Sequence, residues 1–285
     1  MAPAGIAAAG GTPSVLGGLT WERRPIDPLP GPRRLDEVTG ARGLHEAVAL
    51  AGPDARGPGG FRFAEGRMAE VLGEETVLVD PNPGPAAIAA GLAVACRELD
   101  CDLVVLLDVG GDVLAHGDEA GLGSPLADAV VLAAAPALAA SGVTVIGGIL
   151  GAGCDGELRP AEVAARLDEV AAAGGALGDC DVDAATLDRL AAAVEAVPTE
   201  ASAMALRCAR GETGDVPIRD GRRTVTLTPA GGRVFLFDCE AAIGSAARLA
   251  AAVRDARDLE DAQRILEAMG VGTELSWERG MAAAG

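Results

Sequence analysis

The segment Leu103–Asp108 constrains the fold more than any other part of the chain. It reads LVVLLD, five apolar residues in succession before an aspartate, and Gly110 and Gly111 follow closely. A short, nearly continuous apolar run bounded by glycine and aspartate is typical of a strand that is buried on both faces. Such burial requires helices on each side of a sheet, so the segment predicts an interior strand of an α/β fold.

Three other segments have the same strand-like character: Ser14–Gly17, Thr76–Asp80 and Val143–Ile149. Alanine-rich stretches of helical length lie between and after them, at Gly84–Leu99, Ser124–Ser141 and Ala161–Ala173. Alternating strands and helices predict right-handed crossover connections and parallel strands. We therefore expect an open, mostly parallel, Rossmann-like α/β sheet with helices on both faces.

The rest of the chain predicts smaller elements around this sheet. Residues 24–66 are rich in proline, glycine and arginine, which predicts a surface segment with one short helix at Leu44–Ala51. Four further helices are expected, at Ala184–Val197, Thr199–Arg210, Ala241–Arg254 and Leu259–Met269. A strand–turn–strand pair is expected at Arg223–Leu227 and Arg233–Asp238, and a tail strand at Thr273–Trp277.

The chain shows no internal repeat and no long linker, so we expect a single α/β domain over residues 1–285. Residues 1–210 would form the sheet-and-helix core. Residues 211–285 would form a small C-terminal extension, a β-hairpin with helices, packed on that core.

Charge and cysteine usage limit the partners and the compartment. The formal net charge is −19 and lysine is absent, which argues against nucleic acid and anionic membranes as partners. The six cysteines lack CxxC or other metal-ligand spacing, which is typical of reduced thiols. The longest apolar run, Ala129–Ala140, is too short to span a bilayer, and the N-terminal residues do not resemble a signal peptide. We expect a cytoplasmic protein, and its alanine-rich helices could pack into a homo-oligomer.

Carboxylates and glycines follow the Leu103–Asp108 strand. Asp108 ends it, and Asp112 comes just after Gly110 and Gly111. A carboxylate at the end of a buried strand costs free energy unless a cation, a ligand or hydrogen-bond donors meet it. Ligands of open parallel sheets bind beyond the carboxyl ends of the strands, where glycine lets the backbone come close. We therefore expect Asp108 and Asp112 to be catalytic and metal-binding residues, with the two glycines against the ligand. The alternative is that both aspartates only cap turns.

Further polar residues continue this loop: His116, Glu119, Ser124 and Asp128. Ser124 precedes a proline, which is typical of a helix start, and the amides of a helix start attract anionic groups. We expect Glu119, Ser124 and Asp128 to bind the ligand. His116 is a candidate general acid, or a solvated surface histidine. An oxygen-rich loop suits Mg²⁺, which takes one or two carboxylates plus substrate oxygens.

A second glycine-rich loop leaves the Val143–Ile149 strand and carries Gly153, Asp155 and Glu157. We expect Asp155 to be catalytic and the other two to bind the ligand, because both loops should meet over one edge of the sheet. Gly151, Gly153 and Gly156 also have the G-x-G-x-x-G spacing of dinucleotide-binding loops. However, the loop does not run straight into a helix, and the next stretch, GGALGDCDVD, does not resemble a strand. Cys154 is a weaker candidate nucleophile, because no histidine lies near it in sequence.

Trp21 and Arg23 follow the first strand and could clamp a planar or anionic ligand. Alternatively, Trp21 closes the core of a protein that has few aromatic residues. The chain has neither a G-x-S-x-G nucleophile elbow nor a Walker loop, which disfavours hydrolase and P-loop chemistry.

With these residues assembled, the chain resembles an uncharacterised family known as domain of unknown function 1152. The matching segments are VLGGLTWER (15–23), DVGGDVLAHGDE (108–119), SPLADA (124–129), GAGCDGEL (151–158) and TELSWER (273–279). The resemblance implies no particular activity. Members of the family are expected to open with a strand and a glycine-rich loop, whereas this chain begins MAPAGIAAAGG. A truncated start, or the lack of one ligand-binding loop, would explain the difference.

Three functions therefore compete. The first is an enzyme that acts on a small polar metabolite at the acidic strand-end loops, with Mg²⁺ as the candidate cofactor. The second is a non-catalytic small-molecule-binding or scaffold subunit. The third is an NAD(P)-dependent oxidoreductase, for which the glycine spacing is the only support.

Overall fold

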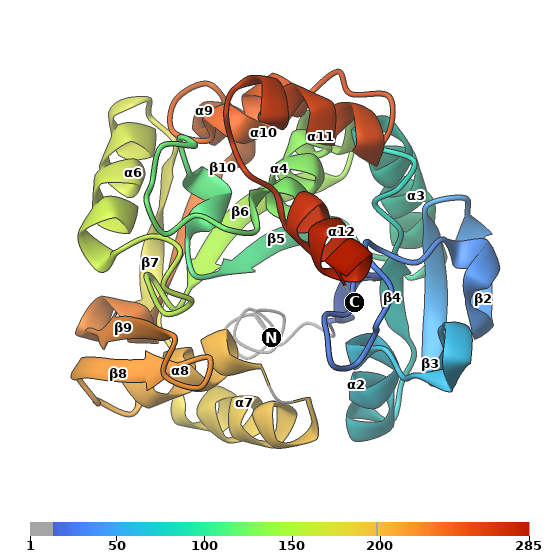
Figure 1. Ribbon diagram of the computed structural model, residues 1–285, viewed down its shortest axis with the longest axis horizontal. Coiled ribbons are helices and arrows are strands. Elements are labelled where there is room, and N and C mark those ends of the chain that lie inside the picture. Colours follow the sequence, from blue (N-terminus) through green and yellow to red (C-terminus); the bar gives the residue numbers. More distant parts are fainter. Residues whose placement is uncertain (1–13, 198, 285) are drawn as a thin grey trace.

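The computed structural model describes residues 14–197 and 199–284 and has a mixed α/β architecture (Figure 1). The first of two four-stranded sheets has the order β1-β4-β3-β2. Its strands are β1 (Gly17–Leu19), β4 (Thr76–Val79), β3 (Val48–Arg56) and β2 (Thr39–His45). Only β1 and β4 run parallel, because β3 and β2 form an antiparallel hairpin beside β4.

The second four-stranded sheet positions the candidate site and has the order β5-β6-β10-β7. Its strands are β5 (Leu103–Val109), β6 (Thr144–Leu150), β10 (Arg233–Asp238) and β7 (Ala176–Asp181). β5 and β6 are parallel, but β10 lies antiparallel between β6 and β7. The open-sheet α/β expectation thus holds in its coarse form, whereas the expectation of mostly parallel strands is wrong.

Most predicted helices are confirmed, with boundaries close to those expected. They are α3 (Pro85–Glu98), α6 (Pro160–Ala172), α7 (Ala184–Ala196), α8 (Glu200–Ala209) and α11 (Leu259–Ala268). The helix expected at 124–141 is divided into α4 (Pro125–Ala133) and α5 (Ala135–Ala140). Pro136 lies at this division, where it lacks the N–H that a continuous helix would use. The helix expected at 241–254 is likewise divided into α9 (Cys239–Ile243) and α10 (Arg248–Val253).

Several expectations about the smaller elements are wrong. Leu44–Ala51 is not a helix, because Val48–Ala51 begins β3 and pairs with β4. α2 (Ala64–Leu72) follows instead. The predicted hairpin partners are strands but do not pair: β9 (Arg223–Leu227) pairs with β8 (Gly214–Ile218), while β10 joins the second sheet.

Two more corrections concern segments whose neighbours in space decide their conformation. The predicted tail strand at Thr273–Trp277 lies mostly in a helix, α12 (Glu274–Ala284). The stretch GGALGDCDVD (174–183), which was not expected to form a strand, contains β7. This strand is exposed along its length and pairs with β10. The expectation about the segment before Val15 falls mainly on residues 1–13, outside the described residues.

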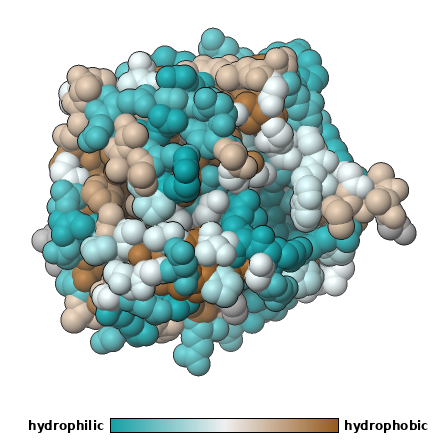
Figure 2. Space-filling view, turned by 60° about the vertical axis from the view of Figure 1, so that its left-hand side comes forward, coloured by the Kyte–Doolittle hydropathy of each residue, from teal (hydrophilic) through white to brown (hydrophobic). Residues whose placement is uncertain are grey.

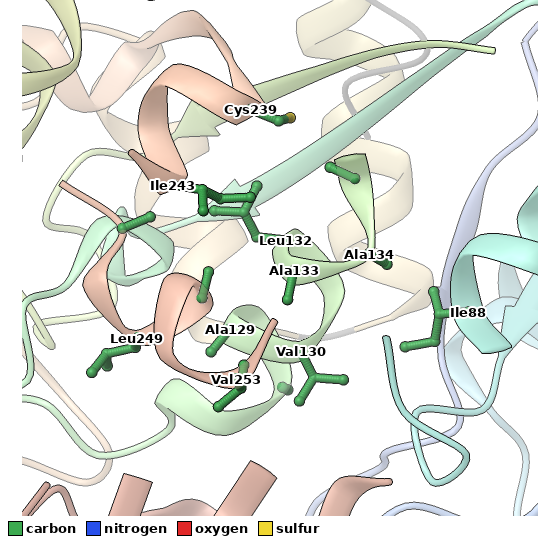
Figure 3. Packing of buried hydrophobic residues seen from close by; sticks show 14 of the residues in the cluster. Ile88, Ala129, Val130, Leu132, Ala133, Ala134, Cys239, Ile243, Leu249 and Val253 are labelled. Atoms are coloured by element: carbon green, nitrogen blue, oxygen red, sulfur yellow. The ribbon is translucent and has the colours of Figure 1, made fainter. Parts of the chain in front are cut away.

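The main apolar core is built around α4, which is buried on nearly every side. Figure 3 shows side chains of α4, α9 and α10 gathered together, with Ile88 approaching from α3. Each fully buried Val or Leu contributes roughly 1.5–3 kcal/mol. This packing fixes the start of α4, which borders the candidate site.

Among the described residues, none of the helices combines the length and apolarity needed to cross a membrane. Polar residues cover most of the face in Figure 2, with apolar residues showing between them in smaller patches.

Candidate functional site

The loops after β5 and β6 lie side by side. Asp108 and Val109 are in register with Ile149 and Leu150, so the two parallel strands end together. Beyond the sheet, the amide of Gly110 donates to the carbonyl of Leu150 at 3.0 Å, and the amide of Gly153 donates to the carbonyl of Gly110 at 2.7 Å. The expected meeting of the two loops is therefore present and is secured by backbone hydrogen bonds.

Gly110 permits the closest approach between these loops. Its φ is +145°, and a Cβ atom there would lie 2.4 Å from the carboxyl carbon of Asp155. Gly111 has a φ of +111°, and its Cβ would lie 2.8 Å from Val163 of α6. Both glycines therefore serve contacts within the protein, and Gly110 specifically makes room for a carboxylate.

Five carboxylates meet above these strand ends. Oxygen atoms of Asp108, Asp112 and Asp128 lie within 4.8 Å of one another, and so do oxygen atoms of Asp112, Asp155 and Glu157. Asp112 belongs to both sets and is only 5 % exposed. We call these five residues the carboxylate cluster.

Hydrogen bonds compensate the members of the cluster unequally. Glu157 accepts from the amides of Gly123 and Ser124 at 2.7 and 2.8 Å and from the Ser124 hydroxyl at 2.5 Å. Asp108 accepts from the amide of Gly111 at 2.6 Å. Asp155 accepts at 3.1 Å from the amide of its neighbour Glu157.

Asp112 and Asp128 differ from these three. Within residues 14–197 and 199–284, no donor lies within hydrogen-bond distance of either carboxyl group. Asp112 is buried and Asp128 is partly buried, so each has little contact with water, and neighbouring negative charge adds to the cost of ionising them.

The pKa values of the cluster reflect this environment. Burial raises the pKa of Asp108 to about 6 and that of Asp155 to about 7, and the charges of other carboxylates contribute to both. Burial followed by the charges of Asp128 and Asp108 raises the pKa of Asp112 well above its usual range. Burial and carboxylate charges likewise raise the pKa of Asp128, which the guanidinium of Arg23 partly offsets. The cluster thus holds more negative charge than its surroundings stabilise.

The start of α4 is not available to an anionic ligand. Glu157 takes the amide of Ser124, and Glu274 of α12 accepts from the amides of Leu126 and Ala127 at 3.0 and 2.9 Å. The protein's own carboxylates therefore occupy the amides that the sequence offered for a ligand. Sequence reasoning missed Glu274, because its segment was expected to form a strand.

His116 and Glu119 belong to a different group. The Nε2 atom of His116 lies 2.9 Å from a carboxyl oxygen of Glu169, and Arg166 donates to Glu119 at 2.9 Å and to Glu169 at 2.8 Å. Glu119 also accepts from the amides of His116 and Gly117. Although burial opposes the effect, these donors lower the pKa of Glu119. The structure does not join either residue to the carboxylate cluster; they attach the loop to α6.

Trp21 and Arg23 bind the C-terminal helix. Trp21 is 8 % exposed and donates from Nε1 to Glu278 at 3.1 Å. Arg23 lies over the Trp21 ring, pairs with Glu278 at 2.7 Å and reaches Glu274 at 3.6 Å. Trp21 thus belongs to the core, whereas Arg23 remains 41 % exposed beside the cluster.

The glycines of the second loop lie against other parts of the protein. Gly153 and Gly156 have positive φ, but Cβ atoms on them would lie 2.7 Å from Pro160 and Arg223 respectively. The glycines therefore accommodate protein atoms. Cys154 is fully buried with its Sγ 3.6 Å from that of Cys208, and this contact raises the pKa of Cys154. Its thiolate is disfavoured, which argues against a nucleophilic role.

Arginines from the β8–β9 hairpin complete the surroundings of the cluster. Arg219 lies 3.6 Å from Glu157 and is 44 % exposed. Arg223 donates to the carbonyls of Asp155 and Gly121, at 3.3 and 2.9 Å, and so ties the two loops together. Sequence reasoning missed both residues, since nothing local indicates that the hairpin folds back onto the loops.

The cluster can hold a cation. Carboxylate oxygens are the ligands that Mg²⁺ and similar hard cations prefer. Asp112, Asp108 and Asp128 offer one such set, and Asp155 and Glu157 offer further oxygens to Asp112.

Comparisons with known proteins give a family without an established activity. Neither the search of curated proteins nor that of solved structures finds a match. A family described as "Protein of unknown function (DUF1152)" matches residues 2–282, nearly the whole chain. The chain therefore belongs to the DUF1152 family.

Proposed function

We propose that the protein is an enzyme that binds Mg²⁺ at the carboxylate cluster and acts on a small polar metabolite held by that ion. The observation that carries the proposal is the environment of Asp112. Its carboxyl is buried, finds no donor among the described residues, and is surrounded by four other carboxylates. A divalent cation would supply positive charge and bind oxygen atoms that receive no hydrogen bond from the described residues.

The residues divide into ligands and supporting groups. Asp108 and Asp112 are the proposed metal ligands, and Asp128 is a candidate third. Such an ion would orient substrate oxygens and acidify a bound water, and Asp155 lies beside the proposed ligand Asp112. We do not assign His116 a catalytic role, because it faces Glu169 and Arg166.

The proposal that part of the fold is Rossmann-like rests on β5 and β6. β5 and β6 are parallel and carry the proposed ligands beyond their carboxyl ends, which is where Rossmann-like sheets bind small molecules. This supports a Rossmann-like origin for the β5–β6 unit.

The cysteines support a cytoplasmic location as part of the proposal. All six are free, and the closest pair, Cys154 and Cys208, lies with its sulfurs 3.6 Å apart. Reduced thiols are typical of cytosolic proteins.

The test is metal-dependent stabilisation of the purified protein, measured by thermal unfolding and calorimetry with Mg²⁺. A ligand that binds only the native state raises the unfolding temperature with its concentration. We expect a response in the wild type and its loss in Asp112→Asn. Asp188→Asn, an exposed aspartate of α7, is the matched control and should respond as the wild type does. Equal responses of Asp112→Asn and the wild type would refute the metal site.

A metabolite screen with and without Mg²⁺ then tests the catalytic part. Metal-dependent binding accompanied by turnover supports an enzyme. Metal-dependent binding of a metabolite that is recovered unchanged would instead establish a binding protein.

A further inference from the structure

Asp112 is shared by two separate sets of possible metal ligands. One set adds Asp108, at the end of β5, and Asp128, in the first turn of α4. The other adds Asp155 and Glu157, both from the loop after β6. The two sets therefore reach Asp112 from different elements.

From this arrangement we propose that the cluster binds two divalent cations bridged by the carboxylate of Asp112. One ion lies between Asp112, Asp108 and Asp128, and the other between Asp112, Asp155 and Glu157. The inference rests on the proposed function, which requires only one ion, and it specifies the substrate class as a phosphate ester.

The burial of Asp112 supports the bridging position. Asp112 is only 5 % exposed, receives no hydrogen bond on its carboxyl group from the described residues, and offers a carboxyl oxygen within 4.8 Å of the ligand atoms in each set. A carboxylate has two oxygens and can accept on both. Asp112 is the one residue that the two sets have in common.

Charge balance favours two ions over one. A single ion between Asp112, Asp108 and Asp128 would leave Asp155, which accepts from one amide, beside the charge of Glu157. Two divalent ions nearly balance five ionised carboxylates.

Two arginines lie beside these acids. Arg219 lies 3.6 Å from Glu157, and Arg23 lies 3.6 Å from Glu274, the acid that caps the start of α4. Both arginine side chains are more than 40 % exposed, and each guanidinium has five N–H donors, more than these contacts use. Paired cations flanked by guanidinium groups can bind the oxygens of a phosphate ester on both sides of the bond that is broken.

The stoichiometry of Mn²⁺ binding to the full-length protein tests the proposal directly. Calorimetry should give two ions per chain in the wild type, and electron paramagnetic resonance should show the magnetic coupling of two neighbouring Mn²⁺ ions. This measurement needs no variant. A stoichiometry of one would refute the second ion but leave the proposed function standing, whereas no binding would refute both.

Variants assign the ions to their sets. Asp128→Asn and Glu157→Gln should each leave one Mn²⁺ bound with loss of the coupling, and Asp112→Asn should weaken both ions. Asp188→Asn should bind two ions as the wild type does. If the protein binds one Mn²⁺ and both Asp128→Asn and Glu157→Gln weaken it, the bridged arrangement is wrong.

Inorganic phosphate tests the substrate class. It should bind the Mn²⁺-loaded protein and fail to bind the metal-free protein, and Arg219→Ala should weaken it roughly tenfold. Arg189→Ala, on the exposed face of α7, is the control and should have no effect. Phosphate that does not bind the loaded protein, or that binds Arg219→Ala and the wild type equally, would overturn the phosphate-ester assignment.

Discussion

Two groups of acidic residues that share the loop after β5 have opposite electrostatic properties. Glu119 and Glu169 are joined by Arg166 and His116 into a network in which each carboxylate has a cationic or donor partner. The carboxylate cluster around Asp112 has a surplus of acids instead. A balanced network stabilises the fold, whereas an unbalanced buried group destabilises it unless a ligand compensates the charge, which is the role we propose for a divalent cation.

The largest expected effect comes from Asp112→Asn, which removes the shared ligand. Altering a residue that only supports a metal ligand costs about 10- to 100-fold in affinity, so loss of Asp112 should weaken Mg²⁺ by more than about a hundredfold. Without metal, Asp112→Asn should be more stable than the wild type, because it removes a buried charge that the neighbouring carboxylates repel. Calorimetry and urea unfolding in EDTA measure the two effects. If Asp112→Asn were less stable than the wild type in EDTA, the cluster would not carry a surplus of negative charge.

Arg166→Ala should break the balanced network. The side chain of Glu119 is 2 % exposed, and removing the partner of a buried charge costs about 3 kcal/mol. Urea unfolding measures this loss, while Mg²⁺ affinity should stay the same. Arg254→Ala removes an exposed ion pair with Glu240 and should change stability by less than about 1 kcal/mol. If Arg166→Ala lowered Mg²⁺ affinity as much as Asp112→Asn does, the balanced network and the carboxylate cluster would not be separate.

The pH dependence of stability should have opposite signs in the two groups. Asp155 has a pKa of about 7 in the folded protein and a usual value of 3.8, so the unfolded chain releases the proton first. Its contribution to stability therefore falls as pH rises from about 4 to 7, by at most about 1.4 kcal/mol per pH unit. Glu119 has a lowered pKa, and its stabilising contribution is present at neutral pH and is lost in acid.

Urea unfolding in EDTA between pH 4 and pH 8 separates these contributions. Asp155→Asn should be more stable than the wild type at pH 8 and similar to it at pH 4. Glu119→Gln should be less stable at pH 8, with the difference shrinking in acid. If Asp155→Asn were instead less stable at pH 8, the carboxylate would be compensated in the native protein.

The smallest expected effect concerns Ser124, whose hydroxyl donates to Glu157. Ser124→Ala removes one of the donors but leaves the amides of Gly123 and Ser124, so stability should fall by about 1 kcal/mol. Chemical denaturation measures the loss. Mg²⁺ affinity should fall less than in Glu157→Gln, and an equal fall in both would mean that the hydroxyl itself is a ligand.

Local patterns predicted the parts of the fold whose environment is uniform. Leu103–Leu107 is a continuous apolar run and β5 forms there, although its residues are partly buried rather than buried on both faces as expected. By contrast, Val48–Ala51 is equally compatible with a buried helix and a buried strand, and the pairing with β4 decides the outcome. The exposed strand β7 has no apolar pattern at all and exists because β10 pairs with it.

The candidate site was likewise only partly predictable from the sequence. Strand-end aspartates and glycines indicated the loops that bring Asp108, Asp112 and Asp155 together. Glu274, Arg219 and Arg166 were not predictable, because each comes from a distant element and its role depends on tertiary contacts. Sequence therefore indicated where acids gather, but not which acids are neutralised.

The cap on α4 has a consequence for synthesis of the chain. Glu274 accepts from the amide of Leu126, which precedes it by 148 residues. At 5–20 residues per second, a ribosome needs roughly 7–30 s to make the intervening segment. The first turn of α4 therefore leaves the ribosome with open amides, and the nascent chain must wait for α12 before this helix start is closed.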